Sequence, residues 1–297
     1  MKVLVFDIGG TAIKHSVCVD GQLAEIYETP TNAPLGGRHV MDTVIGLIRK
    51  ESGYDAIGIS TAGQVNPQEG SIIYANSNLS DYTGMQIQKE LESLFQKPVA
   101  VENDVNSAAM GEAVYGAGRD YDDFLCLTYG TGVGGAIVQN KRIYHGCGFS
   151  AGEFGGIVTH GTRRRADRNP LAGCYEHYAS ASALVKRALE YDSSLTNGRA
   201  IFQHMDNPDV RAIVDCWIDE IILGLTTLTH IFNPSCIILG GGIMVQPYII
   251  GQINEKIYQS IIPSFSRVKI KAAALGNHAG LLGANHFACT RCVSNSH

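Results

Sequence analysis

The chain has 297 residues, of which 45% are hydrophobic, so it is long enough to form two globular domains. Its net charge is −5, which excludes the broad basic surface typical of nucleic-acid-binding proteins, and the short run Arg163–Arg165 is expected to be a solvated loop. No stretch reaches the roughly 18 consecutive apolar residues of a membrane span. The sequence also lacks signal-peptide features, so we expect a cytoplasmic protein without nucleic-acid or membrane partners.

Residues 3–14 have the pattern of an apolar strand, a tight turn and a second strand. Gly9 and Gly10 lack Cβ atoms, so the backbone can turn tightly there and present N–H groups to an anion. Asp7, at the end of the first strand, could hold a magnesium ion through water. The same pattern is typical of a plain β-hairpin, and this segment alone favours the hairpin.

The next segments alternate between predicted helices and strands. Apolar periodicity predicts helices over 39–51 and 85–95, and continuous apolar runs predict buried strands over 56–60 and 98–102. Residues 61–70 are rich in turn-forming residues and are expected to be a loop. This alternation indicates an α/β layer.

Asp104 follows the strand predicted over 98–102 and precedes a small-residue run over 107–115. An acid in this position is commonly an N-cap of the helix. Strand carboxyl ends are also where α/β sheets bind ligands, and this context favours a functional role for Asp104.

A second strand, turn and strand occupies 124–138, after a glycine- and acid-rich stretch over 116–123 that we interpret as the hinge between two halves. Two such hairpins facing each other across a cleft could hold a polyphosphate. A third glycine run, 239–243, follows an apolar strand over 236–239 and could lie against a base and ribose. None of the three runs is a P-loop, because none contains Gly-Lys-Ser or Gly-Lys-Thr.

The C-terminal half has three segments with helical periodicity. These predicted helices cover 175–190, 209–232 and 279–288. Trp217 lies on the apolar stripe of the second, so we expect a core or subunit contact. The chain's eight cysteines lack a dense disulfide pattern, so we expect reduced thiols, including the Cys-x-x-Cys pair Cys289 and Cys292.

Five motifs resemble, in type and order, those of the ROK family of sugar kinases and sugar-responsive repressors. They are Asp7-Ile-Gly-Gly-Thr11, Glu102-Asn-Asp-Val-Asn106, Tyr129-Gly-Thr-Gly-Val-Gly-Gly135, Ala151-Gly-Glu-Phe-Gly155 and Gly240-Gly-Gly242. The resemblance implies an α/β protein with the actin-like ATPase (ribonuclease H-like) fold, in which two α/β domains surround a central cleft. The expected domains are 1–117 with about 279–292, and 118–278.

The resemblance also implies the roles of individual residues. Asp104 is the expected catalytic base, and Asp7 the expected magnesium ligand through water. ATP is expected to contact Asp7, Gly9, Gly10, Thr11, Lys14, Gly130, Thr131, Gly132, Gly240, Gly241 and Gly242. The sugar is expected to contact Gly63, Gln64, Asn76, Asn103, Glu153 and Glu176. For Asn76, a turn-capping amide is an equally good interpretation.

The sequence departs from the family where many members bind a structural zinc ion. Gly156 stands in the place of a histidine, and Asp167 and Asn169 stand in the places of two cysteines. Cys174 remains, but one thiolate does not make a tetrahedral site. The neighbouring histidines, His160 and His177, do not have the family's positions. We therefore expect no zinc site.

The expected activity is therefore transfer of phosphate from ATP, with magnesium, to the 6-hydroxyl of a hexose. The sequence does not separate glucose, N-acetylmannosamine and a β-glucoside, although the missing zinc ligands argue mildly against a typical glucokinase. A sugar-responsive repressor would need an additional DNA-binding domain, and a pseudokinase would not need Asp7, Asp104 and both glycine turns. The resemblance also implies a homodimer.

Overall fold

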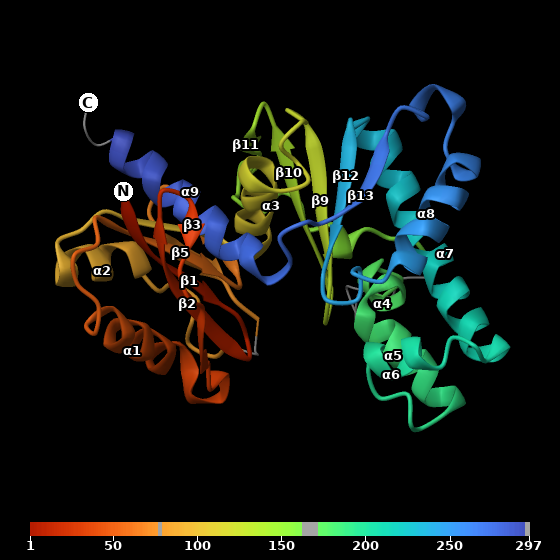
Figure 1. Ribbon diagram of the computed structural model, residues 1–297, viewed down its shortest axis with the longest axis horizontal. Helices are drawn as coiled ribbons and strands as arrows, with labels where there is room; N and C mark the ends of the chain where they lie inside the picture. The colour runs from red at the N-terminus through yellow and green to blue at the C-terminus, as the bar shows by residue number, and fades with distance from the viewer. Residues whose placement is uncertain (77–78, 162–171, 295–297) are drawn as a thin grey trace. The chain divides into compact units, whose positions relative to one another are not determined.

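The computed structural model describes residues 1–76, 79–161 and 172–294, and its chain forms two compact units (Figure 1). The first comprises Met1–Asp120, Lys141–Ala151 and Asn277–His297, and the second comprises Tyr121–Asn140 and Gly152–Gly276. The sequence-based division placed 141–151 in the second domain. In the structure this segment belongs to the first unit, where the Lys141 Nζ donates to the Gly118 carbonyl oxygen at 3.4 Å. Residues Arg163–Arg165, Asp167 and Asn169 lie outside the described residues.

The first unit is built on a mixed sheet in the order β3-β2-β1-β5-β8, with β4 also paired to β2. Strand β1 pairs antiparallel with β2 and parallel with β5, which pairs parallel with β8. The strands are β1 Lys2–Ile8, β2 Ala12–Val19, β3 Gln22–Leu23, β4 Tyr27–Pro30, β5 Ala56–Thr61 and β8 Val99–Asn103. The first predicted strand–turn–strand is thus confirmed as an antiparallel pair.

Helices cover both faces of this sheet (Figure 1). Leu4, Phe6 and Ile8 alternate along β1 and share one core with apolar residues of α1 and α2. Helices α3 and α9 pack together, and α9 also contacts β1, β5 and β8. The helices are α1 Gly36–Ile48, α2 Ile87–Phe95, α3 Asp104–Tyr115 and α9 Ala279–Ser294. The C-terminal helix therefore packs on the N-terminal sheet, as predicted.

The second unit contains the repeated hairpin β9–β10, with the strands in the order β10-β9-β12-β13. Trp217 of the long helix α7 is fully buried, and its indole N–H donates to the carbonyl oxygens of Ala179 and Ser180 at 3.0 Å each, so its predicted core position is confirmed. The strands are β9 Phe124–Tyr129, β10 Val133–Gln139, β12 Cys236–Gly240 and β13 Lys269–Ala272. The helices are α4 Glu176–Ala179, α5 Ala181–Tyr191, α6 Gly198–Gln203, α7 Pro208–Phe232 and α8 Pro247–Ser260.

Two sequence-based expectations were wrong in detail. The expected loop over 61–70 contains strand β6, Gln64–Asn66, which pairs with β7, Ser71–Tyr74. The expected helix over 175–190 is broken at Ser180, whose ψ of 158° is extended and whose hydroxyl oxygen accepts a hydrogen bond from the Ala183 amide. Ser180 therefore acts as an N-cap that separates α4 from α5.

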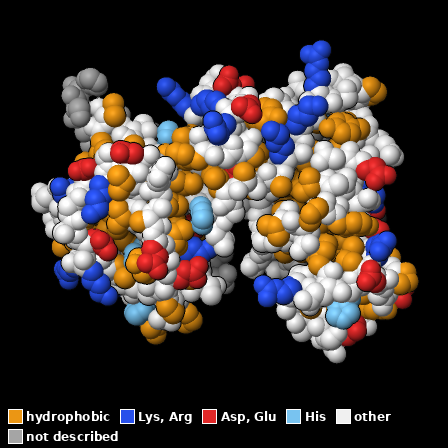
Figure 2. Space-filling model, viewed as in Figure 1, with side chains coloured by type: hydrophobic (Ala, Val, Ile, Leu, Met, Phe, Trp, Pro, Cys, Tyr) orange, Lys and Arg blue, Asp and Glu red, His pale blue; other side chains and the backbone are white. Residues whose placement is uncertain are grey.

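The surface has no strong segregation of charge in the view of Figure 2, where acidic and basic side chains are interspersed with apolar ones. Of the helices that the structure describes, none is long and apolar enough to cross a bilayer. All eight cysteines are free thiols, as predicted.

Candidate active site

The first glycine turn connects β1 and β2 at residues 9–11. The Gly9 amide donates to the Ala12 carbonyl oxygen at 3.0 Å, and the Thr31 hydroxyl donates to the Gly9 carbonyl oxygen at 2.7 Å, so Gly9 shapes the turn. Gly10 and Thr11 are exposed, and a Cβ atom at Gly10 would meet nothing within 4 Å. Gly10 and Thr11 therefore form the open part of the turn that could receive a phosphate group.

Asp7 lies at the end of β1, next to this turn. The Ser60 hydroxyl of β5 donates to its Oδ1 at 2.6 Å. Burial raises the pKa of Asp7, and the Ser60 hydrogen bond and the Lys14 charge oppose that shift. Lys14 lies opposite Asp7 on β2 and is 4.0 Å from Glu28 of β4. A carboxylate is the kind of ligand that Mg²⁺ takes, and the magnesium role of Asp7 stays a prediction.

Asn103 and Asp104 join strand β8 to helix α3. The side-chain oxygen of Asn103 accepts from the amides of Val105 and Asn106 at 2.9 and 3.1 Å, so Asn103 and not Asp104 is the N-cap. The Asn103 amide group donates to the Gly63 carbonyl oxygen and to Asp104 Oδ1, both at 2.9 Å. Asn103 thereby fixes the position of the Asp104 carboxylate.

The protonation of Asp104 is unusual for an aspartate. Burial raises its pKa from 3.8 to about 7, and the negative charge of Asp7 adds to this shift. Hydrogen bonds from Val105 and Asn103 act in the opposite direction. A carboxylate with a pKa near 7 can accept a proton at neutral pH and release it again, which is the property of a general base.

The three residues predicted from segment 61–76 are placed differently. Gly63, with a φ of 99°, is joined to Asn103 through its carbonyl oxygen. Gln64 is half-buried in β6. Asn76 is exposed, and its carbonyl oxygen accepts from the Leu79 amide at 3.1 Å, which fits a turn residue. Of these three residues, Gly63 has a described contact with the Asn103–Asp104 junction.

A contact next to this junction, between a buried glutamate and a partly exposed histidine, is not evident in the sequence. Glu102 is 2% exposed, and its Oε1 accepts hydrogen bonds from the backbone N–H of Asn103 at 2.9 Å and from the side-chain amide of Asn106 at 3.0 Å. Its Oε2 lies 2.7 Å from His145 Nε2. Because these two residues are distant in the sequence, no local pattern could have predicted their contact.

The second glycine turn lies in the second unit. The Gly130 amide donates to the Gly132 carbonyl oxygen at 3.0 Å, and Thr131 is exposed at the tip. The Glu176 carboxylate lies against the turn, because a Cβ atom at Gly132 would come within 2.6 Å of its Oε2. Glu153 is exposed and precedes the 3₁₀ turn Phe154–Gly156. The predicted sugar residue Glu176 thus lies beside a predicted phosphate turn.

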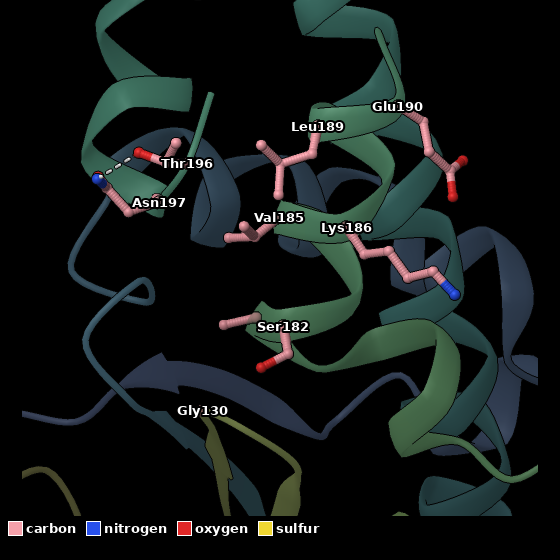
Figure 3. Close-up of a pocket in the computed structure, with 10 residues that line it drawn as sticks. Gly130, Ser182, Val185, Lys186, Leu189, Glu190, Thr196 and Asn197 are labelled. Atoms are coloured by element: carbon pink, nitrogen blue, oxygen red, sulfur yellow. Dashed lines mark hydrogen bonds between the residues drawn. The ribbon is translucent and has the colours of Figure 1, made fainter. Parts of the chain in front are cut away.

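A pocket of about 680 Å³ extends from this turn (Figure 3). In Figure 3, Val185 and Leu189 extend to one side of α5 and Lys186 and Glu190 to the other, and all four contribute to the lining. The lining also includes the start of α5, the glycine turn and the segment that leads into α6: Ala181, Ser182, Gly130, Thr196, Asn197 and Gly198. Val185 and Leu189 thus give the pocket an apolar surface on α5, and Thr196 and Asn197 add a hydroxyl and an amide group. This composition suits a flat nucleoside.

The third glycine run, Gly240–Gly242, lies near the same pocket. Gly241 has a φ of 107°, and a Cβ atom there would overlap the backbone of Tyr129, so the close turn requires glycine. The side chain of Ile243 lies against Gly198, where a Cβ atom would come within 3.3 Å of it. The run containing Gly240 and Gly242 thus leads to the edge of the pocket.

Filling the pocket should selectively weaken nucleotide binding. We expect Val185→Trp to raise the KM for ATP about tenfold or more, because the indole occupies the space of the base, while the KM for the sugar stays unchanged. Steady-state kinetics with each substrate varied in turn measures both values. Leu223→Trp, at a 48% exposed position of α7, is the control. An equal rise in both KM values would contradict a nucleotide pocket here.

Comparison with known proteins identifies the family. The model of the ROK family matches residues 3–291. The chain belongs to the ROK family. Its ROK relatives include the β-glucoside kinase of Listeria monocytogenes, 31% identical with 97% of each chain covered, and the glucokinase of Thermotoga maritima, 30% identical with 96% of each covered.

Solved structures of the family agree with this assignment. The ROK family glucokinase of Streptomyces griseus, solved with glucose and AMPPNP, is 27% identical, with a TM-score of 0.82 over 98% of this chain and 100% of that chain. The fold is the actin-like ATPase fold, and the chain is a sugar kinase. Both conclusions confirm the sequence-based predictions.

Cys174 and Gly156 are the residues at the expected zinc position that the structure describes. Cys174 is buried, and its thiol donates to the Gly156 carbonyl oxygen at 3.3 Å. Within the described residues, no three His, Cys, Asp or Glu side chains gather in a metal-binding arrangement. A single thiol does not make a tetrahedral ligand set, and the absence of a zinc site stays a prediction, because Asp167 and Asn169 lie outside the described residues.

Proposed function

We propose that this ROK kinase transfers the γ-phosphate of ATP to the 6-hydroxyl of a hexose or hexose derivative, with Asp104 as the general base. The observation that carries the proposal is the Asp104 carboxylate, which Asn103 orients at 2.9 Å and whose pKa burial raises to about 7. A primary alcohol needs such a base, because its proton must leave as the bond to phosphorus forms.

The residues around Asp104 have complementary roles in this mechanism. Asp104 accepts the proton of the 6-hydroxyl, and Asn103 keeps the carboxylate in place while Gly63 keeps Asn103 in place. Magnesium held through water by Asp7 would neutralise phosphate charge. The exposed residues Gly10 and Thr11 would contact the phosphates through backbone N–H groups.

The second unit supplies the nucleotide-binding residues in this proposal. The adenosine would occupy the pocket lined by Val185 and Leu189, with the Gly240–Gly242 run at its edge, and the phosphates would reach Gly130–Gly132. Glu153 and Glu176 would bind sugar hydroxyls. Hydroxyl geometry distinguishes one sugar from another, so polar partners of this kind would determine which sugar is bound.

A coupled assay of ADP release across a panel of sugars tests the proposal. The panel contains glucose, N-acetylmannosamine and β-glucosides, because the relatives' names include glucokinase and β-glucoside kinase. We expect at least one sugar to stimulate ADP release, with the product carrying phosphate on carbon 6 by NMR. Absence of sugar-dependent ADP release would favour a regulator or pseudokinase, and phosphate on another carbon would contradict the 6-hydroxyl.

A further inference from the structure

Phe149 has a backbone conformation that is unusual for a bulky side chain. Its φ is 57°, in the left-handed region. The other non-glycine residues with positive φ in the described part of the chain are all polar, most of them Asn or Asp, which adopt this region readily: Asp20, Asn32, Asp81, Gln96, Asn140, Lys141 and Asn233. Strain of this kind persists where the surrounding structure enforces it, and it is concentrated at binding and catalytic sites.

The loop that carries Phe149 is closed by its own contacts. The Ala151 amide donates to the His145 carbonyl oxygen at 3.1 Å, and the Ser150 hydroxyl donates to the Gly148 carbonyl oxygen at 3.1 Å. Phe149 itself is only half-buried, so its ring does not fill the core. The strained conformation therefore holds an aromatic ring at the surface.

The ring of Phe149 is connected to the Asn103–Asp104 junction through the side chains of His145 and Glu102. The rings of Phe149 and His145 pack edge to face, with centroids 6.4 Å apart. His145 Nε2 lies 2.7 Å from Glu102, whose other oxygen accepts from the Asn103 amide at 2.9 Å. The segment begins at β11, Arg142–Ile143, which contacts α3 in the same unit (Figure 1). We call the rings of His145 and Phe149 the aromatic wall.

We propose that the aromatic wall is a subsite for the second ring of a glucoside, either an aryl aglycone or another sugar. This inference rests on the proposed function, because the first ring must present its 6-hydroxyl to Asp104. The ring attached at carbon 1 then extends beyond the first ring, and its apolar face stacks on Phe149. Aromatic rings provide such contacts at little cost in side-chain entropy, and the Glu102–His145 contact fixes the wall in place.

The test compares glucose, phenyl β-glucoside and cellobiose as acceptors. We expect the wild-type protein to have its highest kcat/KM with a glucoside. Phe149→Gly should lower kcat/KM for glucosides about tenfold and leave glucose unchanged, because only the second ring loses its partner. Glycine adopts a φ of 57° without strain, so the Tm should stay the same or rise. Phe149→Tyr keeps the ring and should keep glucoside turnover.

The outcomes separate this inference from the proposed function. An equal effect of Phe149→Gly on glucose and glucosides, or turnover of hexoses with none of glucosides, would overturn the aromatic wall while leaving the kinase proposal intact. Turnover of no sugar would overturn both. If Phe149→Gly lowers kcat/KM for phenyl β-glucoside but not for cellobiose, the aromatic wall binds aryl aglycones. If it lowers kcat/KM for cellobiose but not for phenyl β-glucoside, the wall binds a second sugar. Calorimetric binding of phenyl β-glucoside to wild type and Phe149→Gly gives a readout independent of turnover.

Discussion

Asp104→Asn is expected to lower kcat by about 10²- to 10⁴-fold while sugar binding stays close to that of the wild type. Asparagine has nearly the same shape and can still interact with Asn103, but its amide cannot accept the proton of the attacking hydroxyl. Turnover measured by ADP release and sugar affinity measured by calorimetry separate the two effects. The exposed acid Asp120, replaced in the same way, is the control. Near-normal turnover of Asp104→Asn would remove Asp104 from the mechanism.

The raised pKa of Asp104 adds two pH-dependent readouts. In the wild type, kcat/KM should rise with pH around 7, because the base must be ionised. This limb should disappear from the residual activity of Asp104→Asn. The free energy of unfolding should change with pH in the opposite direction to kcat/KM and fall as the pH rises from about 4 to 7. In this range the folded protein holds a proton on Asp104 that the unfolded chain releases. The ionised carboxylate thus destabilises the fold, and Asp104→Asn should raise the Tm at pH 8 more than at pH 5.

Gly283→Ala should destabilise the first unit by about 2 kcal/mol. A methyl group at Gly283 in α9 would overlap the backbone carbonyl of Ser107 in α3, and backbone cannot move aside as a flexible side chain can. Overpacking of this kind costs about 3 kcal/mol, which exceeds the roughly 1 kcal/mol that alanine gains over glycine in a helix. Urea unfolding monitored by circular dichroism measures the difference. Because α3 begins at Asp104, kcat should fall as well.

Gly46→Ala is the matched control for this substitution. Gly46 also lies within a helix, α1, but a Cβ atom there would meet nothing within 4 Å. The substitution should therefore stabilise the protein by about 0.5–1 kcal/mol through helix propensity alone. A similar response at both positions would contradict the close packing of α3 on α9.

The local features of the active site could be predicted from the sequence because each depends on near neighbours. The turn at Gly9 and Gly10 follows from glycines between two apolar runs, and it forms an antiparallel hairpin in the structure. Helix α7 ends at Phe232, where Asn233 and Pro234 follow, as its periodicity predicted. The single helix predicted over 175–190 was wrong in detail, because the Ser180 hydroxyl accepts a hydrogen bond from the Ala183 amide and separates α4 from α5.

The sequence by itself determined the glycine turns, the acid at the end of β8 and the family of the protein. These features are encoded in residues close together in the chain, where backbone freedom and side-chain spacing act directly. Only the tertiary structure decided that Asn103 caps α3, that Asp104 has a pKa near 7 and that Glu102 contacts His145. The charge of a carboxylate depends on its burial and on groups distant in the sequence such as Asp7, so the pKa of Asp104 rises only once folding has brought them together.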